Sequence, residues 1–96
     1  MKFAFGKALK TARKSRGLTQ EDFSSVSSRT YLSTLERGQK CPTLDKIHLL
    51  AQSLGIHFLS LMALTTLYKE EDCDLDALLV RIRLEVESVD LGRKAP

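Results

Sequence analysis

Apolar residues recur at helical rather than strand spacing along the chain. Phe5, Leu9 and Ala12 repeat every three or four residues, so they line one face of a helix. That helix is predicted to run from about residue 3 to residue 16. Gly17 follows at the position where a left-handed residue commonly ends a helix. Because β-branched runs are few and tryptophan is absent, the pattern predicts an all-α chain.

The next segment predicts a short helix that leads into a turn. Thr19 can cap this helix, and Asp22 can reach back to complete a capping box. The helix is expected to end near Ser25 and to bury Phe23 and Val26. Serines then dominate the sequence, which is typical of a turn.

Residues 29–38 predict a second short helix with two unlike faces. Ser27 or Ser28 can cap it, and Leu32 and Leu35 form an i, i+3 pair on one side. Polar residues occupy the other side: Arg29, Thr30, Ser33 and Thr34. One face is therefore predicted to pack, whereas the other is free to bind.

Two further helices are expected in the middle of the chain. Thr43 can cap the first, which ends at Gly55. Its apolar stripe consists of Leu44, Ile47, Leu50, Ala51 and Leu54. The second helix spans about residues 58–68 and is apolar on most sides, so one flank is predicted to be core and another to need a partner.

Asp74 can cap a last helix, which is predicted to run to about residue 89. Its apolar positions step by four, three, four and three residues, as in the seam of a short coiled coil: Leu75, Leu79, Ile82, Val86 and Val89. Two heptads are too few to be stable alone, so the seam must pack on its own domain or on a second subunit. The preceding helices already complete a small globule, which favours a dimer interface.

Charge divides the chain into unlike parts. Residues 1–40 carry nine basic and three acidic side chains, whereas residues 69–96 carry five basic and eight acidic ones. The N-terminal part can therefore bind a polyanion, while the C-terminal part cannot. No stretch approaches the length of a membrane span, and no secretory signal is visible, so we expect no membrane partner. Cys41 and Cys73 lack zinc-like spacing, which indicates reduced thiols, no metal site and a cytoplasmic protein.

At this point the residues resemble the lambda-repressor-like helix-turn-helix family, also called the Cro/C1 or XRE type. The resemblance covers about residues 3–64. It rests on Arg13 five residues before Leu18 and on four runs: Leu18-Thr19-Gln20-Glu21, Glu36-Arg37-Gly38, Pro42-Thr43-Leu44 and Leu54-Gly55-Ile56. The segment from Thr19 to Gly38 is shorter than is usual in the family. The missing residues must come from the helix after Thr19 or from its turn.

The resemblance implies a five-helix DNA-binding domain, which we place at residues 1–68, with residues 69–96 as a C-terminal amphipathic extension. It also implies a homodimer on a nearly palindromic operator in double-stranded DNA, in a bacterial or phage setting on the nucleoid. Arg13 and Glu36 match a family ion pair that ties the recognition helix to the scaffold. Gln20 matches a DNA-contacting glutamine that touches a phosphate and braces the start of that helix.

By the same resemblance, a group of residues matches base-facing positions: Ser28, Arg29, Thr30, Ser33 and Thr34. Arg29 is the strongest candidate, because an arginine at this end of the helix can hold guanine O6 and N7 with two parallel hydrogen bonds. A second group is expected to contact phosphate: Lys14, Tyr31, Arg37 and Lys40.

The favoured function is a sequence-specific, dimeric transcriptional regulator, most simply a repressor. The alternative is an antitoxin or anti-regulator that acts mainly through protein contacts of the C-terminal helices, with a partner that the sequence does not identify. Phage repressor and restriction controller are both consistent with the resemblance. We expect no enzyme and no cofactor, because neither His48 nor His57 is paired with a nucleophile and no glycine-rich phosphate loop exists.

Overall fold

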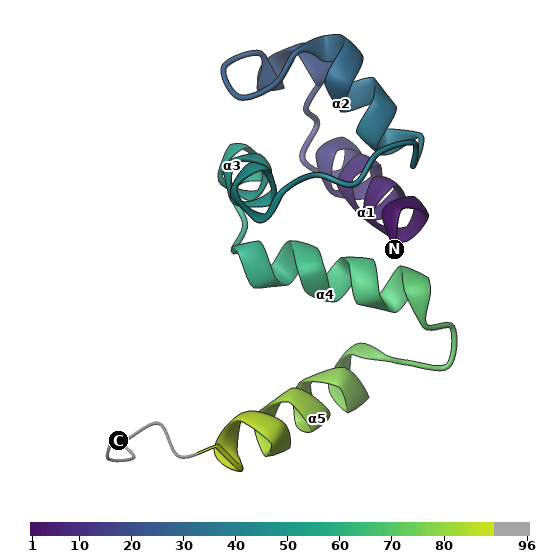
Figure 1. Ribbon diagram of the computed structural model, residues 1–96, viewed down its shortest axis with the longest axis vertical. Coiled ribbons are helices and arrows are strands. Elements are labelled where there is room, and N and C mark those ends of the chain that lie inside the picture. Colours follow the sequence, from purple (N-terminus) through teal and green to yellow (C-terminus); the bar gives the residue numbers. More distant parts are fainter. Residues whose placement is uncertain (90–96) are drawn as a thin grey trace.

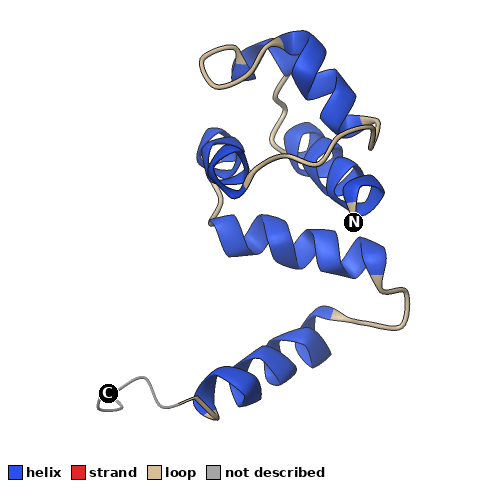
Figure 2. Cartoon of the chain, viewed as in Figure 1, coloured by secondary structure: helices blue, strands red, loops and turns tan. Residues whose placement is uncertain are grey.

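The computed structural model describes residues 1–89, and within that range every regular element is helical (Figures 1 and 2). The elements follow in the order α1 (Lys2–Ser15), the 3-10 helix η1 (Gln20–Phe23), α2 (Arg29–Glu36), α3 (Leu44–Leu54), α4 (Phe58–Lys69) and α5 (Leu75–Glu87). The prediction of an all-α fold is confirmed for these residues. The division at residue 69 stays a prediction, and residues 90–96 of the expected extension lie outside the described residues.

The core lies between α1, α2, α3 and α4. The predicted apolar face of α1 is buried, as are Phe23 and the two leucines of α2. From α3 and α4, the core receives Ile47, Leu50, Ala51, Leu54 and Leu61. α4 packs along α1, and the hydroxyls of Thr11 and Tyr68 lie 2.8 Å apart where the two helices meet. One expectation for the stripe of α3 was wrong: Leu44 is exposed, because it begins the helix at the rim of the core.

Most helix ends carry the caps that the sequence predicts. Thr19 and Asp22 form the capping box, Thr43 caps α3 and Asp74 caps α5. Of the two serines offered for α2, Ser28 is the cap and accepts from the Tyr31 N–H. Gly17 and Gly55 both have positive φ after a helix, which explains why glycine stands there.

The short helix after Thr19 differs from its prediction. It is a single 3-10 turn that ends at Phe23 rather than an α-helix reaching Ser25. Phe23 is buried as expected, whereas Val26 is only partly buried. A capping box marks where a helix starts and carries no information on its length, and the serines that follow are poor helix formers.

α5 packs only lightly on the rest of the molecule, and its main neighbour is α4 (Figure 1). No residue of α5 is buried. α2 and α5 lie at opposite ends of the longest axis of the molecule (Figure 1). No single helix within residues 1–89 is long and apolar enough to cross a membrane. The consecutive helices α3 and α4 meet that criterion only as a pair and are bent by 102°.

Candidate nucleic-acid interface

α2 has one buried and one accessible face. Leu32 and Leu35 are fully buried and join the core behind the helix. On the opposite side Arg29 and Thr30 are exposed, and the next turn is partly exposed at Ser33 and Thr34. Side chains of this accessible face can therefore contact a ligand without any change in the packing of the helix.

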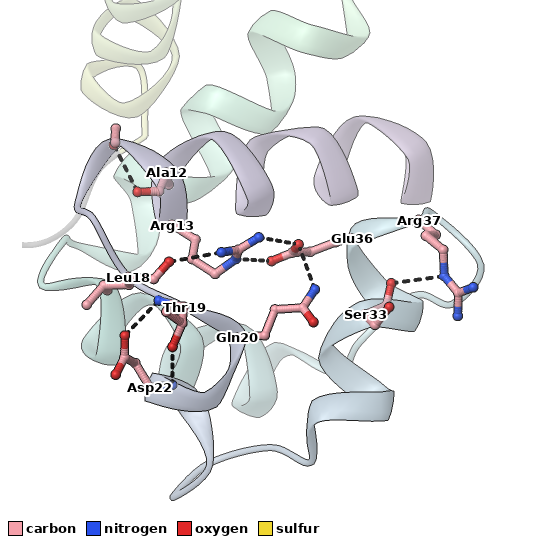
Figure 3. Close-up of polar contacts among 10 residues, drawn as sticks. Ala12, Arg13, Leu18, Thr19, Gln20, Asp22, Ser33, Glu36 and Arg37 are labelled. Carbon is pink, nitrogen blue, oxygen red and sulfur yellow. Dashed lines mark hydrogen bonds and ion pairs between the residues drawn. The ribbon is translucent and has the colours of Figure 1, made fainter.

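A buried ion pair fixes α2 to α1 (Figure 3). Arg13 Nε lies 2.6 Å from Glu36 Oε2, and Arg13 Nη2 lies 2.9 Å from Glu36 Oε1, so the pair is bidentate. The side chains are only 10% and 4% exposed. Arg13 Nη1 also donates to the Leu18 carbonyl, which connects the pair to the start of the turn. The hydrogen bond to Glu36 raises the pKa of Arg13, against the opposing effect of burial, so the guanidinium stays charged.

Gln20 completes this network from η1. Its Nε2 donates to Glu36 Oε1 at 3.2 Å (Figure 3). Arg13, Glu36 and Gln20 thus link α1, the end of α2 and η1 through one carboxylate. The resemblance gave Gln20 a role in bracing the start of this helix, whereas its side chain contacts Glu36 at the end of α2. Its contact with DNA stays a prediction.

α1 approaches the end of α2 closely, and this contact was not predicted from the sequence. A Cβ on Gly6 would lie 2.6 Å from the Leu35 carbonyl oxygen and 2.8 Å from that of Glu36. Gly38, which ends α2 at a φ of 73°, approaches Phe3 in the same way. Glycine at both positions lets the two backbones nearly touch. A glycine inside the predicted helix was the only signal, and helices tolerate isolated glycines for several reasons.

The predicted base-contacting residues gather around a shallow hollow of about 300 Å³. Its lining includes Gln20, Arg29, Thr30, Ser33 and Arg37. Ser28 is exposed beside it, although its side chain is engaged as the cap of α2. Thr34 Oγ1 donates to the Thr30 carbonyl, so the methyl group of Thr34 is the part that remains for a contact. The hollow therefore offers two guanidinium groups, an amide and small hydroxyl side chains, which are groups that can read base edges.

The ring of Tyr31, in the first turn of α2, has two cationic side chains nearby. The Tyr31 ring lies 5.9 Å from Lys40 Nζ and 5.5 Å from Lys46 Nζ, both within cation–π range. Lys46 also donates to the Val26 carbonyl and so joins α3 to the turn before α2. Lys46 was not among the predicted residues, because nothing local in the sequence pairs it with a residue twenty positions earlier.

The other predicted phosphate contacts lie on the same N-terminal part of the molecule. Lys14 is exposed in the last turn of α1, and Arg37 is exposed at the end of α2. Arg37 Nε donates to the Ser33 carbonyl (Figure 3), which leaves its terminal nitrogens for other partners. Their contact with phosphate stays a prediction.

No group of three or more histidine, cysteine or acidic side chains in residues 1–89 is arranged to hold a metal ion. His57 caps α4 through Nδ1, which accepts from the Leu59 N–H. His48 stacks on Phe58 with the ring centroids 4.0 Å apart. Cys41 and Cys73 are both free. The histidines therefore have structural partners.

The predicted dimer residues lie on an apolar surface at the other end of the molecule. Leu75, Leu79, Ile82 and Val86 are exposed on α5, and Val89 is exposed just after this helix, which ends at Glu87. Leu75 and Leu79 meet α4 at a groove of about 420 Å³, whose α4 side is formed by Leu59, Ser60, Ala63, Leu64 and Leu67. The groove and the exposed apolar side chains of α5 together are called the α4–α5 surface from here on.

Comparison with known proteins gives a consistent result. A helix-turn-helix family model matches residues 9–61, which include α1 after its first turns, η1, α2, α3 and the start of α4. An uncharacterized HTH-type transcriptional regulator, y4dJ, from Sinorhizobium fredii is 44% identical over 55 residues, which are 55% of this chain and 71% of that protein. The immunity repressor protein of Bacillus phage phi105 is 34% identical over 74 residues, which are 75% of this chain and 51% of the repressor.

Proposed function

This chain belongs to the helix-turn-helix family of the lambda-repressor (Cro/C1, XRE) type, whose members are DNA-binding transcriptional regulators, and from that premise we propose that it is a dimeric repressor. In this proposal α2 of each copy enters the major groove of a palindromic operator. The bound dimer blocks access of polymerase to the promoter. Such a protein acts in the cytoplasm, on the nucleoid of a bacterium or on the DNA of a phage in its host.

The accessible face of α2 is the observation that supports the proposal most. It combines an arginine at the N-terminal end of the helix with small hydroxyl side chains, over two leucines that are fully buried. The ion pair of Arg13 with Glu36 and the contact from Gln20 fix the helix from behind. A reading helix must keep its orientation when it meets the groove, and this network supplies that rigidity.

Each group of side chains then has a distinct role. Arg29 donates two hydrogen bonds to a guanine, an interaction worth about 1 to 3 kcal/mol of discrimination. Thr30 and Thr34 present methyl groups to thymine. Contacts of Lys14, Tyr31, Arg37 and Lys40 with phosphate set the register of the protein and carry no sequence information.

Dimerisation through the α4–α5 surface is the second part of the proposal. Half-sites read by such dimers lie about 34 to 36 Å apart, one turn of DNA. The molecule measures 44 × 29 × 23 Å, and α2 and α5 lie at opposite ends of the longest axis. Two copies that pack side by side hold their α2 helices about one molecular width apart. Copies that pack end to end hold them about two lengths apart, which is too far for adjacent half-sites.

A gel-shift titration tests the proposal. The full chain is titrated with duplex from its own upstream region and with a scrambled duplex of equal length and composition. We expect tighter binding to the upstream duplex, and Arg29→Ala should remove most of that difference by loss of the guanine contact. Equal affinity of the unaltered chain for both duplexes would refute sequence-specific binding.

The exposed α4–α5 surface also favours a second candidate function, an antitoxin or anti-regulator that binds an unrelated protein. Arg29→Ala and Leu79→Asp separate the two functions, because they alter opposite ends of the molecule. A complex with an unrelated protein that survives Arg29→Ala and is lost in Leu79→Asp would support this candidate. Loss of DNA binding in Arg29→Ala, with no protein partner bound at α5, would exclude it.

A further inference from the structure

An ion pair crosses the turn between η1 and α2, at the edge of the face assigned to base contacts. Arg29 Nη1 donates to Glu21 Oε1 at 3.3 Å. The side chains are 72% and 74% exposed, so the pair contributes little to folding. Both residues line a second hollow, of about 350 Å³, beside the one already described.

We propose that Glu21 is a positioning residue for Arg29 and thereby determines how strictly the protein selects guanine. The inference rests on the proposed function, because it assumes that Arg29 reads a base. The carboxylate holds one end of the guanidinium and directs the rest of the group toward the groove.

The donors of Arg29 support this role. A guanidinium has five N–H donors in a planar fork, and recognition of guanine uses two parallel ones. Glu21 engages Nη1, and the Arg29 side chain makes no other hydrogen bond within residues 1–89. The edge formed by Nε and Nη2 therefore remains for a base. An arginine that is already held also loses less rotamer freedom when it binds.

The charge at the start of α2 gives a reason for the pair to form. Arg29 is the first residue of α2, and the first turn of this helix contains no acidic residue. A cation at a helix N-terminus is opposed by the helix dipole. Glu21, from η1, supplies the negative charge that this end lacks.

The same carboxylate is unfavourable near any DNA backbone. Glu21 repels phosphates in every duplex, so it weakens binding to all sequences. The duplex that offers guanine to Arg29 recovers this loss through the oriented contact. Because specificity is a difference between affinities, a residue that weakens all binding and favours one contact increases it.

Selection from a randomised duplex library, with the full chain and sequencing of the bound fraction, tests the inference. We expect the unaltered chain to prefer guanine at one position of each half-site, and Arg29→Ala to lose that preference. Glu21→Ala should reduce it roughly threefold or more, as expected for coupled residues in contact. Preferences at other positions should persist, and binding to scrambled duplex should tighten. Asp45→Asn, which removes an equal charge from the first turn of α3, is the matched control and should change no preference.

The double variant distinguishes positioning from a simple effect of charge. In the Arg29→Ala background, Glu21→Ala should have no further effect on base preference. Two results would overturn the inference while leaving the proposed function intact. One is that Glu21→Ala changes the base preference equally at all positions of the site. The other is that Glu21→Ala changes it by the same amount with and without Arg29. Enrichment of no sequence by the unaltered chain would overturn the proposed function and this inference with it. An unchanged melting temperature of the Glu21→Ala variant would exclude misfolding as the cause of any change in its base preference.

Discussion

Glu36→Ala should destabilise the protein strongly, although the residue lies at the end of a short surface helix. Its carboxylate accepts two hydrogen bonds from Arg13 and one from Gln20, and the side chain is only 4% exposed. Removal of the carboxylate leaves a buried guanidinium without its counter-ion. That unpaired charge dominates the cost, because it keeps its desolvation penalty and loses the attraction that offsets it.

The structure sets the expected magnitude. Removal of one partner from a buried pair costs about 3 to 5 kcal/mol. Arg13 keeps its hydrogen bond to the Leu18 carbonyl and lies near the surface, so we expect the lower end, about 3 kcal/mol. In a domain of this size that corresponds to a fall in Tm of roughly 12 to 24 °C.

Titration of Arg13 should not make the cost of Glu36→Ala depend on pH near neutrality. Its pKa is raised in the folded state, chiefly by the hydrogen bond to Glu36. The stabilisation from this shift is therefore fully present below the pKa of the unfolded chain and is lost only as the pH rises through the higher folded value. Both values lie in strongly alkaline solution.

Urea unfolding followed by circular dichroism measures the loss. Glu36→Gln, which keeps an oxygen for Arg13, should lose less than Glu36→Ala. Replacement of both partners, Arg13→Met with Glu36→Leu, should lose less than the sum of the single changes, because no charge is left buried. A loss below about 1 kcal/mol for Glu36→Ala would refute the reasoning, since that is the range of solvated surface pairs.

Three other predictions test the packing, the dimer and the electrostatics. Gly6→Ala should cost about 1 to 3 kcal/mol in the same urea assay, because its Cβ would lie 2.6 Å from the Leu35 carbonyl oxygen. A cost below about 1 kcal/mol for Gly6→Ala would disprove the steric reason. Leu79→Asp should convert a dimer to a monomer by light scattering at micromolar concentration, and an unchanged mass would contradict the interface on α5. Affinity for DNA should fall with salt at a log–log slope near −0.9 per neutralised phosphate, and a flat dependence would exclude a phosphate-bound cationic surface.

The sequence was sufficient for features that depend on local chemistry. The caps at Thr19, Thr43 and Asp74 lie where side-chain oxygens precede apolar periodicity. The buried face of α2 follows from the spacing of Leu32 and Leu35. In each case residues within one or two turns determine the outcome, so periodicity and capping rules apply.

Features that join distant segments were not predictable in this way. The contact of Lys46 with the Val26 carbonyl depends on how α3 is placed against the turn before α2. The close approach at Gly6 depends on the distance between two helix backbones. The length of η1 was also missed, because a capping box marks where a helix starts and not where it ends. The link between Arg13 and Glu36 was found only through the resemblance, because a spacing of twenty-three residues has no local signature.

The central claim is that the accessible face of α2 contacts DNA bases. Amide chemical-shift mapping by NMR, with the full chain titrated against its selected duplex, tests this claim most directly. We expect the largest shifts at residues 28–34, with smaller ones through the loop to Lys40. Shifts confined to α5, with none at residues 28–34, would contradict the account.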